Sequence, residues 1–337
     1  MQVYHAAAAG VLVLAGAAPA HAEWRHEVGE VSIVANGGVS LLGALVDEPD
    51  EPGGFEADGD IDAYGSLNLE WTSNSGLILG GFGSGDTADN RPDTLKNDRL
   101  YTYVASEWGR AEVGLTSGPA RRMTFYAPVV GSGQVRGDFA RYAGRSALLW
   151  PVDTRQSFKF AYFSPPIGNV RFGASWSPKV ERFDAVQRNA FELGAQYEQP
   201  VGDWVLGASA AYVHGDADTP GLKDINSWSL GFQARRGKLV IGGAYVDRGD
   251  SNLFIEDFGQ SEVNLGVAWR ATGWAVALSA ARTTSELIDN DLVGLGGTYD
   301  VGRHVTLTSD VVVMREQDTL GDTRSGLVWV AGVDLKI

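Results

Sequence analysis

The sequence has no cysteine, few prolines and few long runs of consecutive apolar residues. Without cysteine, neither disulfide bonds nor thiolate chemistry can contribute to the fold or to a site. Twelve prolines exclude a proline-rich linker protein, and 44 glycines disfavour long helices, where each glycine costs about 1 kcal/mol. Basic residues are also scarce. The formal net charge of −15 argues against a nucleic-acid partner, because such proteins need a basic face.

The longest apolar stretch lies near the N-terminus, from Ala6 to Ala18. It is followed by the sequence PAHA at 19–22, a small-x-small pattern typical of a signal-peptidase site. Residues 1–22 are therefore predicted to be a secretory signal peptide, and 23–337 the mature chain. Because no Lys or Arg precedes the apolar stretch, an uncleaved membrane anchor is the alternative interpretation. No later stretch has the length of a transmembrane helix, so none is predicted.

The mature chain alternates between two residue classes along most of its length. Apolar or small residues occupy every second position from Ile61 to Trp71, and the same period recurs at 191–198, 228–235 and 262–270. A period of two is that of a β-strand whose two faces meet different surroundings. No segment of the mature chain shows convincing helical periodicity. The predicted fold class is therefore all-β.

Seven short turns divide the chain at nearly regular intervals. Their centres are Asn74, Gly109, Ile167, Gly202, Gly237, Thr272 and Gly302. Four of the six steps between them are 35 residues long, which indicates a repeated strand–turn–strand unit joined by longer polar loops. Each of the seven turns joins two strands, which gives fourteen. One further strand is expected near Val39–Val46 and one at 325–337, so the predicted total is sixteen. Short turns on one side, longer loops on the other and an even number of antiparallel strands are typical of an outer-membrane barrel.

The last strand is expected to pair with the first, because a closed barrel leaves no strand edge with unsatisfied backbone groups in lipid. Alternate apolar residues from Leu327 to Ile337 would then face lipid, and Asp334 and Lys336 would face the lumen or the periplasmic rim. A soluble secreted β-sandwich or solenoid is the alternative, but it would place aromatic residues centrally in its strands. Here five aromatic residues lie beside the short turns, as in an interfacial girdle: Trp71, Trp108, Trp204, Trp274 and Tyr299.

One step is much longer than the others, at 58 residues between Gly109 and Ile167. The excess falls in the loop from Gly118 to Gln156, and long loops in compact structures are usually functional. A barrel of sixteen strands encloses a lumen that wall side chains alone do not fill. This third external loop is therefore predicted to fold inward and narrow the lumen.

Three stretches of the chain resemble the Gram-negative general porin family, of the alphaproteobacterial type. They are 62–82 (DAYGSLNLEWTSNSGLILGGF), 98–118 (DRLYTYVASEWGRAEVGLTSG) and 154–178 (TRQSFKFAYFSPPIGNVRFGASWSP). The resemblance implies a sixteen-stranded barrel with the third external loop in its pore, located in the outer membrane of a Gram-negative bacterium. It also implies a homotrimer that contacts lipid and lipopolysaccharide and lets small hydrophilic solutes and ions diffuse passively, without a cofactor.

Two details accompany this resemblance. Porins of this type typically end in Phe, whereas this chain ends in Ile337. The expected trimer would be favoured by small or apolar residues on the outer face of the first strand, and Leu41, Leu42 and Ala44 are expected there.

The long loop carries the candidate site, because its charge is opposite to that of the whole chain. Between Gly118 and Gln156 there are six arginines and two aspartates, a net charge of +4. The residues predicted to border the pore constriction are Arg121, Arg122, Arg136, Asp138, Arg141, Arg145, Glu70 and Asp62. Rings of charge set the ion preference of channels, so this loop predicts a local preference for anions. The alternative is that several of these arginines lie on the barrel wall or at a subunit interface, paired locally.

Alternation places further charged residues on the lumen face, namely Glu112, Glu192, Glu262, Arg110, Lys159, Arg171 and Arg235. In porins that resemble this chain the inward loop is often the acidic partner, so a basic loop is a departure from that pattern. The acidic segment 47–60 is predicted to be a solvated external loop, with divalent-cation binding as the alternative.

Other functions are less well supported. An enzyme needs a nucleophile with a base in reach, and His26, His214 and His304 of the mature chain have no serine motif around them. No metal-ligand or phosphate-binding spacing occurs, so no metal site is predicted. A substrate-selective channel for a sugar or an anion remains the alternative function, and the sequence FYAP at 125–128 is the feature that would favour a sugar.

Overall fold

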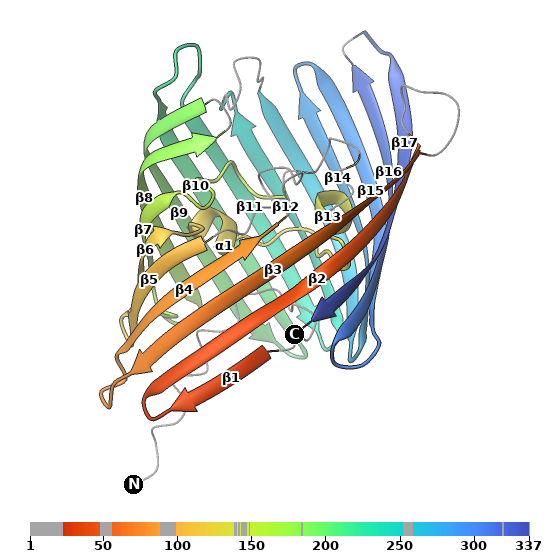
Figure 1. Ribbon diagram of the computed structural model, residues 1–337. Helices are drawn as coiled ribbons and strands as arrows, with labels where there is room; N and C mark the ends of the chain where they lie inside the picture. The colour runs from red at the N-terminus through yellow and green to blue at the C-terminus, as the bar shows by residue number, and fades with distance from the viewer. Residues whose placement is uncertain are drawn as a thin grey trace.

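The computed structural model describes residues 23–47, 56–87, 99–137, 140, 142, 147, 149–182, 185–251, 259–318 and 320–336. These residues form one antiparallel sheet that closes into a barrel (Figure 1). The predicted signal peptide lies outside the described residues, as does Ile337. Among the residues that are described, no helix is long and apolar enough to cross a membrane.

The described part of the chain has sixteen barrel strands, which confirms the predicted all-β fold. Each strand pairs antiparallel with the next one in sequence. The strands are β2 (Val31–Asp47), β3 (Glu56–Thr72), β4 (Ile78–Asp86), β5 (Arg99–Ser106), β6 (Gly109–Leu115), β7 (Phe158–Phe163), β8 (Val170–Arg182), β9 (Ala185–Val201), β10 (Trp204–Ala217), β11 (Ile225–Arg236), β12 (Leu239–Gly249), β13 (Gln260–Ala271), β14 (Trp274–Ser285), β15 (Ile288–Asp300), β16 (Val305–Asp318) and β17 (Thr323–Lys336).

The barrel closes where β17 meets β2. Leu327 lies opposite Asp47, and the register continues without a shift to Lys336 opposite Gly38. From Leu327 to Leu335 the last strand therefore has a neighbour on both sides, β2 and β16, so this part of it leaves no open edge in lipid. The predicted pairing of the last strand with the first is confirmed.

An additional strand, β1 (Glu23–Val28), precedes the barrel and was not predicted. It turns at Gly29, where the backbone has a φ of 60°, and pairs with the first six residues of β2. Glu23 lies opposite Asn36, two positions along β2 from the residue opposite Lys336. Strand β1 therefore continues along the edge of β2 beyond the point where β17 ends.

Tight turns gather at one end of the barrel, the lower rim of Figure 1, and the longer connections lie at the other end, where only two residues join β14 to β15. Most of the tight turns contain a glycine with positive φ, as at Gly109, Gly202 and Gly237, a conformation that costs glycine little. Strand β17 ends on the same side as these turns, so the described chain starts and finishes there (Figure 1).

The outer face of the barrel is apolar along the strands. Leu265, Leu278 and Leu295 are about half exposed on neighbouring strands, whereas the residues between them point inward and are mostly buried. The aromatic residues expected in a girdle lie on this outer face near the tight turns, with Trp108 77% exposed and Tyr299 59% exposed. This distribution of apolar and aromatic side chains is typical of a barrel whose outer face contacts lipid.

One expectation about the outer face was wrong. Leu41 points outward, but Leu42 and Ala44 point inward and are buried in an apolar cluster. Because these neighbouring residues are all apolar, the alternation did not show which set faces out. The inner set is apolar because the long loop packs against it.

Four consecutive strands are short compared with their neighbours. Strands β4 to β7 have 6 to 9 residues, whereas β2, β3 and β9 have 17. The long loop leaves the wall at the end of β6 and returns at the start of β7. The loop therefore enters the lumen well below the upper rim of the taller strands.

Candidate functional site

The loop between β6 and β7 lies inside the barrel, which confirms the predicted inward fold. It contains one short helix, α1 (Pro119–Arg122), and one 3-10 turn, η3 (Gln134–Arg136). Figure 1 shows α1 within the ring of strands. Residues of the loop are among the most buried in the chain, including Ala120, Ala127 and Val135 at 0% exposure.

Side chains of the wall accept hydrogen bonds from the loop backbone. The acceptors lie on β9, β10, β11, β13 and β16, so the loop follows the inner wall across half of the barrel. The bonds run from Ala120 N to Glu192 (3.0 Å), Phe125 N to Ser209 Oγ (2.8 Å), Val152 N to Ser227 Oγ (3.0 Å), Ala127 N to Asn264 Oδ1 (2.9 Å), Leu149 N to Glu262 Oε1 (3.1 Å) and Gln134 N to Asp310 Oδ2 (3.2 Å). Backbone groups that leave a sheet need such partners when they are buried.

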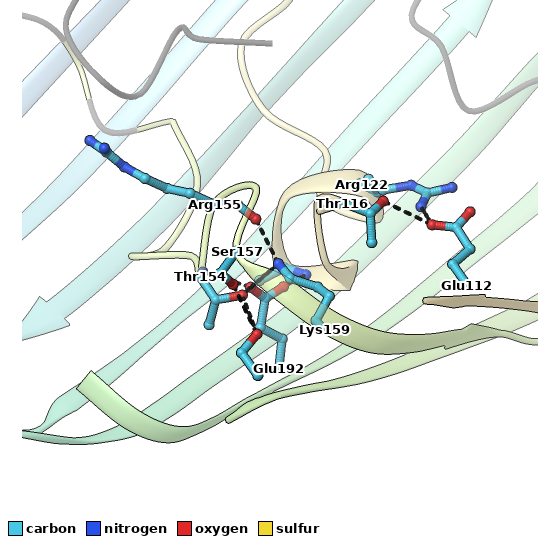
Figure 2. Close-up of polar contacts among 10 residues, drawn as sticks. Glu112, Thr116, Arg122, Thr154, Arg155, Ser157, Lys159 and Glu192 are labelled. Carbon is cyan, nitrogen blue, oxygen red and sulfur yellow. Dashed lines mark hydrogen bonds and ion pairs between the residues drawn. The ribbon is translucent and has the colours of Figure 1, made fainter. Parts of the chain in front are cut away.

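Glu192 on β9 holds both ends of the loop. Its Oε2 accepts the Ala120 amide at the start of the loop, and its Oε1 accepts the Thr154 amide (2.7 Å) and hydroxyl (2.6 Å) at the end. The Lys159 Nζ donates to the Thr154 hydroxyl (2.6 Å) and lies 3.9 Å from Glu192 Oε1, as Figure 2 shows. Both charged side chains are fully buried, and their opposite charges compensate each other.

Inward-facing glycines let the loop approach the wall closely. A Cβ at Gly231 would overlap the carbonyl oxygen of Phe125, and a Cβ at Gly296 would overlap the side chain of Gln134. At Gly231 a Cβ would require a shift of the loop backbone, whereas at Gly296 it would displace the side chains of Gln134 and Asp310.

The rest of the loop is held by apolar packing. Leu149, Trp150 and Ala147 form a cluster with buried side chains of β2, β15, β16 and β17, among them Met314 and Val330. The inner wall is thus polar where the loop backbone needs acceptors and apolar where loop side chains pack.

Four arginines gather around α1 with few carboxylates. Arg110 and Arg122 share the buried carboxylate of Glu112, at 2.6 Å and 2.7 Å, and the Thr116 hydroxyl donates to the same carboxylate (Figure 2). The charges of Arg121 and Arg122 also act on Arg99 at the start of β5, whose Nε is buried without a hydrogen-bond partner. Within the described residues, neither Arg99 nor Arg121 has a carboxylate at ion-pairing distance. The cluster has an excess of positive charge.

Aromatic rings lie beside several of these guanidinium groups. The Arg110 Cζ lies 3.5 Å from the centroid of the Tyr103 ring, and Arg122 lies 4.0 Å from that of Phe163. Arg121 and Arg136 lie 5.0 Å and 4.5 Å from the ring centroid of one residue, Trp150. Such contacts stabilise cations without neutralising them.

The structure describes five of the eight predicted constriction residues. Arg121 and Arg122 in α1 and Arg136 in η3 lie inside the barrel, near one another. Glu70 on β3 accepts hydrogen bonds from the Tyr103 hydroxyl and from Asn68 (3.0 Å), and Tyr103 in turn contacts Arg110. Three further predicted residues, Asp138, Arg141 and Arg145, lie outside the described residues.

Asp62 is buried on the inner face of β3, opposite Ser40 of β2. The other lumen positions that alternation predicted also lie inward, with Glu112, Glu192 and Glu262 nearly fully buried. The acidic segment 47–60 is described only in part, since 48–55 lie outside the described residues. Among the described residues, no group of three potential metal ligands comes together.

Sequence reasoning missed two features of the site. Trp150 was not singled out, because one aromatic residue in a loop shows no period. The serine acceptors Ser209 on β10 and Ser227 on β11 occupy inward-facing positions. The alternation of inward and outward residues along each strand could have identified them. What the sequence did not show is that the loop would pass in front of them.

Comparisons with known proteins agree with this geometry. The sequence profile of the Gram-negative porin family matches residues 6–319. A search of curated protein sequences finds no match. An anion-selective porin from Comamonas acidovorans is 16% identical with a TM-score of 0.65, covering 91% of this chain and 100% of that one.

Two further solved structures share the fold. The outer membrane channel DcaP of Acinetobacter baumannii is 11% identical with a TM-score of 0.60, covering 92% of this chain and 99% of that one. A mutant of the Rh. blastica porin is 15% identical with a TM-score of 0.56, covering 90% of this chain and 100% of that one. At these identities the likeness shows a common fold. Together with the profile match over nearly the whole sequence, it establishes that this chain belongs to the Gram-negative porins, channels of the outer membrane.

Proposed function

We propose that solutes pass through the space left between the inward loop and the wall, and that its narrowest part favours small anions. The supporting observation is the imbalance of charge around α1, where Glu112 is the carboxylate that forms ion pairs with Arg110 and Arg122, and Arg99 and Arg121 form none within the described residues. Charges that line a narrow passage raise the local concentration of ions of opposite sign. Small hydrophilic solutes without charge would still diffuse passively.

The predicted constriction residues contribute to different extents to this proposed narrow passage. Arg121 and Arg122 are its main members, and Arg136 supports them from η3. Glu70 borders the same passage through Tyr103 and Arg110. Asp62 contributes an acidic group higher on β3. Asp138, Arg141 and Arg145 are proposed from the sequence alone.

The test compares Arg121→Gln with the wild-type channel in planar bilayers under a KCl gradient. A unit charge about 8 Å from a permeating ion in a water-like medium is worth about 0.5 kcal/mol, or roughly twofold in the local concentration of each ion. The variant should therefore shift the reversal potential toward potassium, with the protein still folded. The matched control is Arg282→Gln on the outer face, where Arg282 is exposed and contacts Asp289 and Asp291. Equal reversal potentials in all three proteins would contradict an arginine-lined constriction.

A channel selective for one class of anion is the second candidate. The carboxylate-free pair Arg99 and Arg121 supports it, and a structural neighbour is described as anion-selective. Titration with inorganic phosphate during chloride conduction separates the two candidates. Saturable block of the current would support a binding channel, and its absence would leave general diffusion.

We propose that the chain assembles as a homotrimer in contact with outer-membrane lipid and lipopolysaccharide. The short strands β4–β7, together with β8 and β9, present a concave apolar outer surface, lined by Leu79, Val104, Phe160, Tyr162, Trp176 and Leu193. A second copy would cover this surface. The mass of the protein in mild detergent and its migration on unheated gels test this, and a single-barrel mass would contradict it.

We also propose that residues 1–22 are removed as a signal peptide and that the protein is a channel without enzymatic activity. The first described strand begins at Glu23. His214 lies 3.4 Å from Asp216, and the His304 ring contacts the Lys336 carbonyl; within the described ranges neither imidazole forms a hydrogen bond to a serine. The mass of the protein extracted from outer membranes would show whether it begins at Glu23.

A further inference from the structure

Trp150 differs from every other tryptophan of this protein. All ten tryptophans lie in the described ranges, and nine of them are on the outer face or at the rims. Trp150 is the one inside the barrel, where it is 8% exposed. A large ring in a narrow lumen occupies space that a channel could otherwise use for solutes.

The position of this ring is fixed independently of the arginines around it. On one side, the amide of Leu149 donates to Glu262 on β13, at 3.1 Å. On the other, the amide of Val152 donates to Ser227 on β11, at 3.0 Å. The ring also packs against Tyr126, with centroids 5.6 Å apart, within the apolar cluster. The wall therefore holds the indole in place.

Arg121 depends on this ring much more than its neighbours do. Arg110 and Arg122 are held by the carboxylate of Glu112, and this carboxylate cancels part of their charge. Arg121 has no such anion among the described residues, and its side chain lies 5.0 Å from the centroid of Trp150. Arg136 approaches the same ring to 4.5 Å and is otherwise bonded to the Ala147 carbonyl. Without the ring, repulsion between the two guanidinium groups would move the less constrained Arg121 away.

We propose that Trp150 is a positioning residue for selectivity: it holds the guanidinium of Arg121 beside the pore while leaving its charge uncancelled. An indole attracts a cation through its ring electrons and carries no net charge of its own. A carboxylate in its place would hold the arginine more tightly but would remove the field that attracts anions. The inference rests on the proposed anion preference and adds a residue that itself has no charge.

The experiment is a double-mutant cycle on reversal potential, with Arg121→Gln, Trp150→Leu and the double variant in planar bilayers. Loss of a cation–π contact lowers the population of the held guanidinium about two- to fivefold. Trp150→Leu should therefore shift the reversal potential in the same direction as Arg121→Gln. In the Trp150→Leu background, Arg121→Gln should then have a much smaller effect than in the wild type. Full additivity of the two shifts would overturn the proposal.

Two further variants separate positioning from packing. Trp150→Phe keeps an aromatic face and should restore most of the wild-type reversal potential. Leu149→Ala removes a neighbouring side chain of the same apolar cluster and should lower heat stability without changing selectivity. Equal shifts in Leu149→Ala and Trp150→Leu, both folded on unheated gels, would show that Trp150 only packs the loop.

The outcomes also distinguish this inference from the proposed function. If Arg121→Gln leaves the reversal potential unchanged, the anion-favouring constriction fails, and the role of Trp150 fails with it. If Arg121→Gln shifts the potential but Trp150→Leu does not, only the role of Trp150 is overturned.

Discussion

Single inward-facing side chains decide how the loop is held, and Glu192 is the clearest case. Its carboxylate accepts three hydrogen bonds from the two ends of the loop, and it lies beside the buried ammonium of Lys159. Charge-assisted hydrogen bonds of this kind are stronger than neutral ones. A buried carboxylate at the base of the loop therefore fixes a segment that has no strand partner.

Replacing this carboxylate by an amide should release the base of the loop. In Glu192→Gln the Lys159 ammonium loses its charged partner, and breaking a buried pair typically costs about 3–5 kcal/mol. Because the strands keep their ladder, we expect a folded barrel with noisier single-channel currents. Glu198→Gln is the control, since Glu198 is partly exposed and pairs with Arg235 away from the loop. Quiet currents in both variants would show that Glu192 does not hold the loop.

A second prediction concerns the close approach at Gly231. Gly231→Ala adds a methyl group where the Phe125 carbonyl lies, and overpacking of this kind costs about 1–3 kcal/mol. The loop should shift away from β11 and change the conductance. Gly81→Ala is the matched control for Gly231→Ala, because a Cβ at Gly81 meets no atom within 4 Å. An unchanged conductance in Gly231→Ala, with Gly81→Ala also normal, would mean that the loop tolerates the methyl group.

At the scale of elements, the loop and the wall are adapted to each other along the chain. Strands β9, β10, β11, β13 and β16 supply hydrogen-bond acceptors, whereas β2 and β15 to β17 supply apolar side chains. The inner face of a porin barrel is expected to be polar, because it borders water. The apolar inner patch around Val328 and Val330 is explained by the loop that covers it.

Removal of the loop interior should therefore widen the pore and weaken one side of the barrel. If 124–150 are replaced by a short Gly-Ser linker, β6 and β7 can still pair from Arg110–Phe163 to Leu115–Phe158. Single-channel conductance should rise, because the loop no longer occupies the lumen. Heat stability should fall, because buried apolar area worth about 25 cal/mol per Å² becomes exposed. A conductance at the wild-type value would place the constriction elsewhere.

At the scale of the whole molecule, a closed barrel with an apolar outer face requires a bilayer of matching height. Leu295 lies near the middle of β15 and is 54% exposed, whereas Leu335 lies two residues from the end of the chain and is 42% exposed. Both side chains point outward. They differ in their distance from the rim where the tight turns lie.

This difference predicts a dependence on depth. Leu295→Arg should destabilise the folded barrel by about 2–4 kcal/mol, and Leu335→Arg by about 0–1 kcal/mol, because charge costs most at the bilayer midplane. Urea unfolding in lipid vesicles measures both. Equal losses would show that the barrel does not sit in the bilayer with β15 centred.

The sequence by itself determined the strands, their number and the inward loop. Alternation, seven turns and one long step were enough, because each strand must expose one face to lipid and the other to water or the loop. Even so, the prediction that Leu41, Leu42 and Ala44 all face outward was wrong for Leu42 and Ala44. Where the inner face is also apolar, the sequence shows no alternation from which to tell the two faces apart. Strand β1 was missed because its pairing with β2 extends past the end of the barrel.

Only the tertiary structure decided which residues of the loop meet which strands. Glu192, Ser209 and Glu262 are separated from their loop partners by tens of residues or more, and no local pattern links them. The same holds for Trp150 and Arg121, which come together only because the wall fixes the loop backbone on both sides of the indole. Strand periodicity is a local property that composition can carry, whereas a loop inside a barrel takes its path from contacts that form after the barrel has closed.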